Sequence, residues 1–405
     1  MPLSETDAVR RRPANESLEL DPAQDPFARG TIEYLVKRYG SPLFIIDAAR
    51  IRAQYRKLAA ALPNVDLHYA LKPLPQVSVV QTLRDEGAFF DLATNGEVDL
   101  VQHCGVPADR CIHTHPIKRD SDIRTALDYG VSVFVVDNPD ELRKFVKFRG
   151  RASLLIRVSF RSPDAVCDLS RKFGCAPREV AELLSLAAEL RITIAGFSFH
   201  VGSQALNSDM FVHAIDVCRE LMSGAAAAAH HLSILDIGGG FPVDYVNRPS
   251  SIEEYCAPIR HALSTLRPGV RVIAEPGRYI AAPSAISVSS VMGRALRDGL
   301  WWYYLDDGLY GSYSGQMYDH AKYPIDALAA AGGQTFPSVL AGPTCDSIDV
   351  IGENVHLPKL DVGDLIVGRS MGAYTCASAS DFNFFPRACV LALDGGRLLN
   401  DRRLR

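Results

Sequence analysis

Residues 66–92 read DLHYALKPLPQVSVVQTLRDEGAFFDL and contain the pattern on which the fold assignment rests. The apolar run Asp66–Ala70 predicts a strand, the amphipathic segment Gln76–Glu86 a helix, and Phe89–Leu92 a second strand. Strand, helix and strand in this order indicate a parallel βα unit. An open dinucleotide-binding sheet would place a Gly-rich phosphate turn directly after its first strand, and none stands there.

This alternation of strands and helices continues to about residue 280. Eight units spread over roughly 200 residues fit a closed (β/α)8 TIM-like barrel, which we assign to residues 28–280. The predicted strands are Asp66–Ala70, Phe89–Leu92, Cys111–Thr114, Val131–Val136, Ser153–Val158, Ile194–His200, Ser233–Ile237 and Val270–Ala274. The helical patterns include Gln76–Glu86, Asp120–Tyr129, Pro139–Phe148, Pro177–Leu190, Met210–Ser223 and Ile252–Leu266.

The pattern changes after residue 280. Short apolar runs then follow one another across loops without recurring amphipathic helices, which predicts a C-terminal β domain over residues 281–405. These runs are Ile286–Met292, Trp301–Leu305, Val339–Ala341, Leu365–Val367 and Ala388–Leu393. An early run, Leu43–Asp47, precedes the barrel strands and is expected to join the β domain. Residues 1–27 are polar and are expected to form a flexible arm.

Composition limits the possible partners and compartment. The formal net charge of −4 over 405 residues does not indicate a nucleic-acid partner, and no stretch is apolar enough to span a bilayer. The nine cysteines include no CxxC pair and no zinc-type spacing, so no metal is expected. They are typical of buried thiols in a reducing compartment, which predicts a cytoplasmic protein.

Polar residues and glycines follow the predicted barrel strands, where the active sites of such barrels lie. Each of them alone has an ordinary structural explanation, but eight strand ends carrying them in register indicate a site. In chain order they are Lys72; Asp91 and Glu97; His115; Asp137; Arg157; His200, Gly202 and Ser203; Gly238, Gly239 and Gly240; and Glu275, Gly277 and Arg278.

The glycines and Arg278 suggest a phosphate site near the last two strands, because glycine lets backbone N–H groups approach an anion and arginine adds a fixed positive charge. With a phosphate on one side of the rim, Lys72 on the other suggests a Schiff base to a carbonyl cofactor. Glu275 could keep a pyridine nitrogen protonated, and His200 could cover a flat ring. Alternatively, Glu275 forms a plain salt bridge with Arg278.

Further motifs resemble the alanine-racemase-like group of pyridoxal-phosphate enzymes that includes ornithine, diaminopimelate and some arginine decarboxylases. The resemblance covers about residues 40–390, and the residues after Cys345 resemble ornithine decarboxylases, because the diaminopimelate branch would have Glu where Asp346 stands. The motifs are YALK (69–72), FSFHVGSQ (197–204), LDIGGGFP (235–242), AEPGRY (274–279), DDGLYGSY (306–313), YDHA (318–321), GPTCDSID (342–349) and GDLIVGRSMGAYTCASASDFNFF (363–385).

This resemblance implies pyridoxal 5′-phosphate as the cofactor and a role for each matching residue. Lys72 would form the internal aldimine, Glu275 would pair with the pyridine nitrogen, and His200 would stack on the ring. The implied phosphate ligands are Ser203, Gly238, Gly239, Gly240, Gly277, Arg278 and Tyr374. Asp91, Glu97 and Arg157 would shape the surroundings of the cofactor.

The resemblance also implies the substrate contacts and the assembly. Cys345 would reprotonate Cα after carbon dioxide leaves, Asp319 and Asp346 would hold the distal ammonium of the substrate, and Phe382 would line that pocket. Cys345 and Asp346 would act in the neighbouring subunit of a homodimer with two shared active sites. Lys172 and Asp349 match a pair that bridges the subunits. The expected reaction is decarboxylation of L-ornithine or L-lysine in polyamine biosynthesis.

Two segments depart from the family pattern. Pro73 and Leu74 replace a small residue followed by Asn after the cofactor lysine, and His113–Pro116 replaces a more usual Asn-Pro stretch. These departures leave open a decarboxylase of a larger or conjugated amino acid. A catalytically inactive regulatory homologue and an amino-acid racemase are further alternatives, although a racemase would need a Tyr base where Cys345 stands.

Overall fold

The computed structural model describes residues 21, 24–160, 171–224, 229–245, 251–328 and 334–399, so most of the predicted N-terminal arm lies outside the described residues. The chain divides into two compact units, and each is described by itself. One contains residues 50–283, and the other combines residues up to 49 with residues 284–401.

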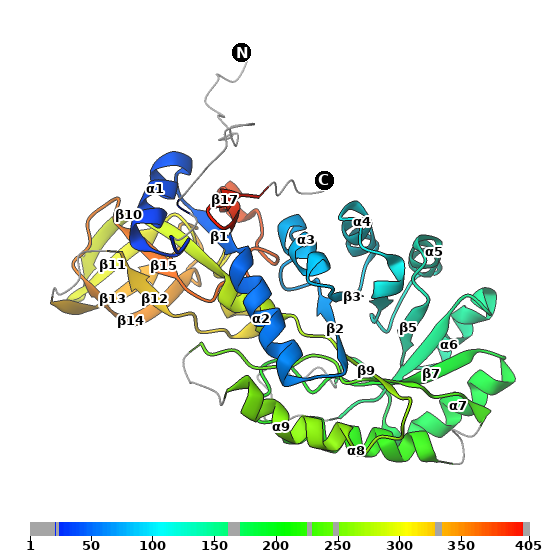
Figure 1. The fold of residues 1–405 in the computed structure, drawn as a ribbon. Helices are drawn as coiled ribbons and strands as arrows, with labels where there is room; N and C mark the ends of the chain where they lie inside the picture. The colour runs from blue at the N-terminus through cyan, green and yellow to red at the C-terminus, as the bar shows by residue number, and fades with distance from the viewer. Residues whose placement is uncertain are drawn as a thin grey trace. The chain divides into compact units, whose positions relative to one another are not determined.

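The first unit is a closed barrel of eight parallel strands, β2 to β9, in chain order. This confirms the predicted (β/α)8 fold, and in Figure 1 the barrel strands run in colour from blue at β2 through cyan and green to yellow-green at β9. The strands are β2 (Val65–Ala70), β3 (Phe89–Leu92), β4 (Cys111–His113), β5 (Val133–Val136), β6 (Ser153–Arg157), β7 (Thr193–Ser198), β8 (Ile234–Asp236) and β9 (Arg271–Ala274). The helices are α2 (Ala48–Ala61), α3 (Val77–Asp85), α4 (Asn95–His103), α5 (Asp120–Tyr129), α6 (Pro139–Lys144), α7 (Val180–Glu189), α8 (Asp209–Ser223), α9 (Ile252–Leu263) and α10 (Arg278–Ala281).

Apolar side chains from neighbouring strands hold the barrel together. The buried cluster has one member from each of β4 to β9, namely Ile112, Val135, Leu155, Ala195, Ile234 and Ile273. Gly196 in β7 has no room for a side chain, because an added Cβ would lie 1.8 Å from the Ile234 carbonyl oxygen of β8. The strands therefore leave the barrel at fixed positions, which places the residues that follow them.

The second unit is a nine-stranded sheet with the order β14-β13-β11-β10-β1-β16-β17, in which β15 pairs with β10 and β12. Its strands are β1 (Leu43–Asp47), β10 (Ala285–Arg297), β11 (Leu300–Leu305), β12 (Ile325–Ala327), β13 (Thr335–Ala341), β14 (Val350–Pro358), β15 (Leu365–Gly368), β16 (Cys389–Asp394) and β17 (Arg397–Leu398), with helices α1 (Arg29–Tyr39) and α11 (Gly315–Asp319). The sequence pattern did not predict α1, β12 or β14.

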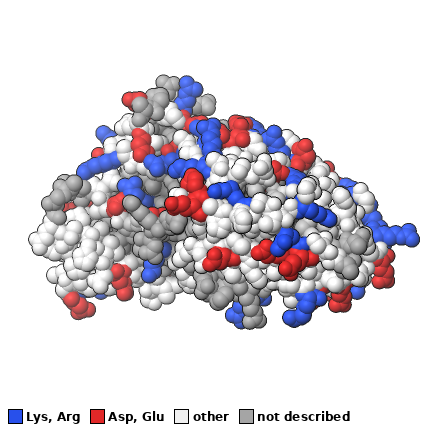
Figure 2. Space-filling model, turned by 60° about the horizontal axis from the view of Figure 1, so that its bottom comes forward, with Lys and Arg blue, Asp and Glu red and all other residues white. Residues whose placement is uncertain are grey.

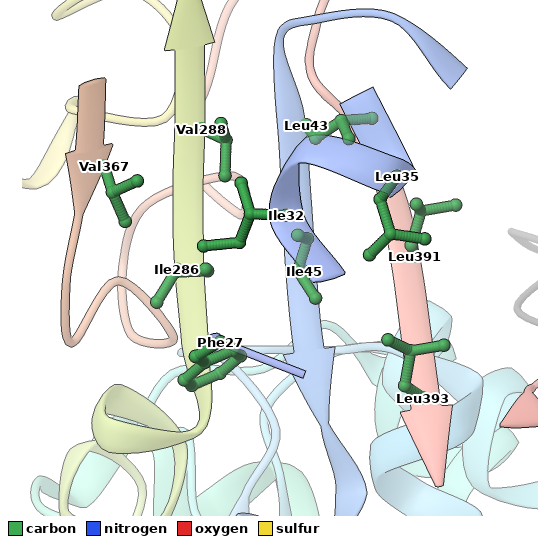
Figure 3. Packing of buried hydrophobic residues seen from close by; sticks show 10 residues of the cluster. All are labelled: Phe27, Ile32, Leu35, Leu43, Ile45, Ile286, Val288, Val367, Leu391 and Leu393. Carbon is green, nitrogen blue, oxygen red and sulfur yellow. The ribbon is translucent and has the colours of Figure 1, made fainter. Parts of the chain in front are cut away.

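The first strand of the chain lies inside this sheet. β1 pairs antiparallel with β10, Leu43 facing Val288, and parallel with β16, Leu43 facing Cys389. Figure 3 shows Ile32 and Leu35 of α1 against the side chains of these strands. Leu43–Asp47 therefore joins the β domain as expected, with all five residues of β1 buried in the sheet next to β10 and β16. Residues 28–42, which were predicted to belong to the barrel, also fall in the β unit, because the apolar residues of α1 pack on these strands.

Surface properties agree with the modest net charge. On the face shown in Figure 2, basic and acidic side chains are interspersed. Within the described ranges, none of the helices combines the length and the apolar character needed to cross a membrane.

Candidate active site

The barrel residues singled out in the sequence lie where its strands end. Lys72 comes two residues after β2, Asp91 lies in β3, and Arg157 is the last residue of β6. The turns after β7, β8 and β9 carry His200 with Ser203, then Gly238–Gly240, then Glu275 with Gly277 and Arg278. Because parallel strands end at one rim, these residues share one face of the barrel.

The turn with Lys72 is braced from both sides. The Ala70 amide donates to the Pro276 carbonyl at 3.2 Å, and the Leu71 amide donates to the Asp91 carbonyl at 3.4 Å. Pro73 is buried, and its Cγ lies 2.7 Å from the position that a Cβ on Gly277 would take. The unusual proline therefore packs against the β9 turn, while Lys72 itself is exposed in the single chain.

Buried carboxyl groups surround Lys72. Burial raises the pKa of Glu275 well above its usual range, and the neighbouring Asp236 raises it further, whereas Lys72 and Arg157 lower it. Asp236 accepts a 2.9 Å hydrogen bond from the Gly238 amide, which favours its ionised form. Burial raises the pKa of Asp236 as well, to about 6, and of the two acids Glu275 is the one whose protonated form is favoured more strongly. The charges that act on Glu275 are those of Asp236, Lys72 and Arg157.

Glu97 has a structural role in addition to the one predicted. Thr94 caps α4 by accepting from the Glu97 amide at 3.3 Å, and a Glu97 carboxyl oxygen accepts from the Ala93 amide at 2.5 Å. The Glu97 carboxylate thus ties the first turn of α4 to the residue before its N-cap. Burial raises the pKa of Glu97 to about 7, with Asp91 acting in the same direction.

His200 is held as a neutral ring. Burial lowers its pKa well below the usual value, and the positive charges of Arg157 and Lys72 lower it further. Its Nδ1 accepts from the Gly202 amide at 3.0 Å, which fixes the ring orientation. Its Nε2 lies 3.3 Å from the position that a Cβ on Gly239 would take. A neutral ring next to a glycine turn suits stacking on a flat group.

The glycine turn after β8 forms a cradle without side chains. Added Cβ atoms would approach the Phe199 carbonyl oxygen at Gly238 (2.2 Å), the Glu275 carbonyl oxygen at Gly239 (2.7 Å) and the Gly202 carbonyl oxygen at Gly240 (2.5 Å). Gly238 and Gly240 also have positive φ values of 65° and 119°, which favour glycine.

The motifs before and after the glycine turn contribute a cluster of hydrogen-bond donors around Arg278. Arg278 donates from Nε and Nη2 to Ser203 Oγ at 3.2 and 2.9 Å, and from Nη1 to the Tyr245 hydroxyl at 3.1 Å. Arg278 and Ser203, both predicted phosphate ligands, are therefore in direct contact. The arrangement suits an anion.

Phe173 joins cationic and aromatic side chains at the rim. Arg157 and Lys172 lie 5.6 and 5.0 Å from its ring centre, and the His115 ring meets it edge-on at 5.5 Å. His115 Nδ1 accepts from the Ile117 amide at 3.1 Å, which fixes the orientation of its imidazole. His115 belongs to the segment His113–Pro116, which differs from the family pattern. Asp137, the residue after β5, accepts from the Gly174 amide at 2.8 Å and fixes the chain next to Phe173.

The β domain contains the residues predicted to bind the substrate. Tyr310 links two of them: its hydroxyl donates to Asp346 at 2.5 Å, and its ring stacks on Phe382 with centres 4.4 Å apart. The hydrogen bond from Tyr310 lowers the pKa of Asp346. Cys345 is exposed, and its amide donates to Asn383 Oδ1 at 3.1 Å.

Two further predicted residues lie on other elements of the same domain. Asp319 is the last residue of α11, and Tyr374 is half-buried with a positive φ of 56°. The Tyr374 carbonyl accepts from Ser378 Oγ at 3.2 Å. The roles of Asp319 toward the substrate and of Tyr374 toward the phosphate stay predictions.

Asp349, matched to an intersubunit pair with Lys172, is occupied within its own domain. It is 2% exposed and accepts from the Leu309 amide at 2.8 Å and from the Thr344 amide and hydroxyl at 3.0 and 2.7 Å. Gly308 and Gly342 also pack closely on its carboxylate. Asp349 therefore shapes the turn before Cys345, and its bridge to Lys172 stays a prediction.

Several residues that contact the predicted ones were not assigned roles from the sequence, among them Asp236 and Thr114 in the barrel and Tyr310 in the β domain. Asp236 and Tyr310 stand inside the matched motifs and could have been noticed there. Thr114 and Tyr245 lie outside those motifs. Thr114 forms a hydrogen bond with Asp91, and Tyr245 forms one with Arg278; in both pairs the partners are distant in the sequence and meet only in the folded chain.

Comparisons with known proteins place the chain among enzymes. Residues 48–282 match the family described as "Pyridoxal-dependent decarboxylase, pyridoxal binding domain". A lysine/ornithine decarboxylase from Vibrio vulnificus, solved with cadaverine, is 56% identical, with a TM-score of 0.86 over 90% of this chain and 98% of that one. The lysine/ornithine decarboxylase of Selenomonas ruminantium is 35% identical over 87% of this chain and 90% of its own length. Mouse ornithine decarboxylase is 36% identical over 85% and 78%.

Proposed function

The chain belongs to the pyridoxal-dependent decarboxylases, and from this membership we propose that carboxylates of its β domain select the distal ammonium group of the substrate. The reaction is the pyridoxal 5′-phosphate-dependent decarboxylation of L-ornithine or L-lysine to the diamine and carbon dioxide. The likeness to such enzymes favours decarboxylation over a racemase or an inactive regulator. We place the reaction in polyamine biosynthesis, because its products are diamines.

The barrel rim fits the cofactor. The side-chain-free cradle at Gly238–Gly240 leaves room for a phosphate, and Ser203 with Arg278 offers donors for it. Lys72 would hold the cofactor covalently through Nζ. The bound ring supplies an electron sink for the charge that remains at Cα when carbon dioxide leaves.

The barrel residues would bind and orient this ring. Glu275, whose protonated form burial favours, would share a proton with the ring nitrogen, and His200, whose neutral form burial favours, would cover one ring face. Asp91 and Arg157 would balance the charge near Lys72. In the β domain, Cys345 Sγ would deliver a proton to Cα.

The observation that carries the specificity proposal is the group around Tyr310. Its hydroxyl orients Asp346 and lowers the pKa of this carboxyl, and its ring packs on Phe382. An ionised carboxylate beside an aromatic surface suits a substrate with an alkyl chain that ends in an ammonium group. Asp319 would add a second carboxylate.

We further propose a homodimer with composite sites, in which the barrel of one subunit works with Cys345 and Asp346 of its partner. The motif around Cys345 resembles that of ornithine decarboxylases, and this resemblance implies active sites shared between two subunits, which supports the proposed assembly. A cytoplasmic location is proposed from the free thiols, since all but Cys345 of the described cysteines are buried or half-buried, as suits a reducing compartment.

The test of the specificity proposal is a substrate panel. The cofactor-loaded enzyme is incubated with L-ornithine, L-lysine, L-arginine, L-glutamate and L-norleucine, and the amines are identified by mass. We expect putrescine and cadaverine as products. Norleucine matches the lysine chain without its ammonium, and turnover of norleucine at the rate of lysine would refute selection of the distal charge.

A further inference from the structure

Thr114 makes a side-chain contact that links two neighbouring strand ends. Thr114 directly follows β4, and its amide extends the β3–β4 ladder by donating to the Leu92 carbonyl at 3.0 Å. Its hydroxyl donates to Asp91 Oδ1 in β3. The exposed fractions are 9% for Thr114 and 3% for Asp91, so water does not compete freely for this bond.

Lys118 fixes the turn in which Thr114 stands. Its buried Nζ donates to the carbonyls of His115, Pro116 and Val135 at 2.8, 2.9 and 2.6 Å. Burial lowers the pKa of Lys118 to about 7. Its amide donates to Glu141 at 3.1 Å, which ties the turn to α6. A β-branched threonine in such a fixed turn has little rotamer freedom, so its hydroxyl stays directed at Asp91.

Asp91 lies among charged groups from five strand ends or the turns beside them. Burial raises its pKa to about 7, and the negative charge of Glu275 acts in the same direction, whereas Lys72, the Thr114 hydroxyl and Arg157 oppose these effects. The remaining acids that interact with it are Glu97 and Asp236. Near neutral pH the charge of Asp91 is therefore finely balanced, and one hydrogen bond can decide it.

We propose that Thr114 is a positioning residue whose hydroxyl favours the ionised form of Asp91 beside Lys72 and thereby sets the pH range in which the Lys72 amine takes up the cofactor. This inference rests on the proposed role of Lys72. An anion beside Lys72 stabilises its ammonium form. Without the hydroxyl, Asp91 would hold its proton to higher pH, and Lys72 would lose its proton at lower pH. Bond formation with an aldehyde needs the neutral amine.

The variants are Thr114→Val, which removes the hydroxyl at similar shape, and Thr114→Ser, which retains it. Thr82→Val is the matched control, because the Thr82 hydroxyl is also buried but donates to the Ser78 carbonyl within α3. The first readout is the pH dependence of pyridoxal-phosphate affinity, measured by fluorescence on the cofactor-free protein. We expect this profile to move to lower pH in Thr114→Val by up to about one pH unit. Loss of one hydrogen bond to a charged group changes the pKa of Asp91 by about one unit or more, and Lys72 feels that change through its charge interaction with Asp91. Thr114→Ser and Thr82→Val should keep the wild-type profile.

The second readout needs no cofactor. Unfolding free energy of the apoprotein should fall with rising pH while folded Asp91 holds its extra proton, and in Thr114→Val this fall should extend to higher pH. In an Asp91→Asn background, Thr114→Val should no longer change either readout, and this background serves if Thr114→Val alone folds poorly. Unshifted profiles in Thr114→Val, or an equal shift in Thr82→Val, would overturn the proposal. Absence of covalent cofactor on Lys72 in wild type would instead refute the proposed function and leave the second readout valid.

Discussion

Gly277 is the position where one methyl group should disturb the site most directly. A Cβ there would lie 2.7 Å from Pro73 Cγ, 3.3 Å from Pro73 Cδ and 3.3 Å from Ala70 Cβ. Ordinary contact needs at least 3.4 Å, so the turn after β2 must move by about 0.7 Å or more. The proline ring cannot rotate away. We therefore expect Gly277→Ala to destabilise the apoprotein by about 1–3 kcal/mol, the usual result of overpacking.

The displacement should also reach Lys72, the residue before Pro73. A shift approaching 1 Å in a reacting group can cost up to about a hundredfold, and we expect cofactor affinity to fall by roughly tenfold to a hundredfold. Removing the obstacle should restore most of both losses, so Pro73→Ala should rescue Gly277→Ala.

The assay is a double-mutant cycle on urea unfolding of the apoprotein and on cofactor affinity. Gly293→Ala is the control, because the Cβ position there is open and the backbone is not left-handed. The cycle removes the effect of Pro73→Ala on the unfolded chain. If Gly277→Ala costs as much without Pro73 as with it, the contact between the two turns is not the cause and the reasoning is wrong.

Four further predictions concern the proposed roles. Borohydride treatment of the loaded enzyme should attach the cofactor to the Lys72 peptide, and a label on another lysine would contradict the assignment. Mixing inactive Lys72→Ala with inactive Cys345→Ala should restore about a quarter of wild-type activity by random assortment, whereas mixtures that stay inactive after verified subunit exchange would rule out shared sites. Asp346→Asn should lower kcat/KM for lysine by roughly ten- to a hundredfold and for norleucine much less; equal losses would exclude ammonium recognition. Finally, burial raises the pKa of Asp91 to about 7, so the folded apoprotein holds a proton that the unfolded chain releases above about pH 4. Stability should fall as pH rises through this window, and Asp91→Asn should reduce the slope by up to about 1.4 kcal/mol per pH unit, as measured by urea unfolding at each pH.

Strand ends could be predicted from the sequence because they depend on local pattern. Each barrel strand is a short apolar run, and the rule that chemistry follows such strands located Lys72, Asp91, Arg157, His200 and Glu275 before any contact was known. The resemblance then added cofactor identity and the β-domain residues. These inferences need only the local sequence pattern and the order of the motifs along the chain.

Contacts between distant segments could not be read in the same way. The place of β1 between β10 and β16 depends on pairing across most of the chain, which no local pattern records. Thr114 is an ordinary strand residue until Asp91 is seen beside it. Tyr310 and Asp346 are separated by 36 residues and meet only because the domain folds.

The central position of β1 has a consequence for how the protein is made. About 240 residues separate β1 from β10, so at ordinary translation speeds β1 leaves the ribosome roughly ten to fifty seconds before its first partner. The barrel strands β2–β9 are contiguous and can close during that interval. The apolar LFIID segment meanwhile has neither neighbour, and unpaired strand edges invite wrong association. Chaperone occupancy of nascent chains should therefore peak after the barrel has emerged and fall only when β16 has been synthesised.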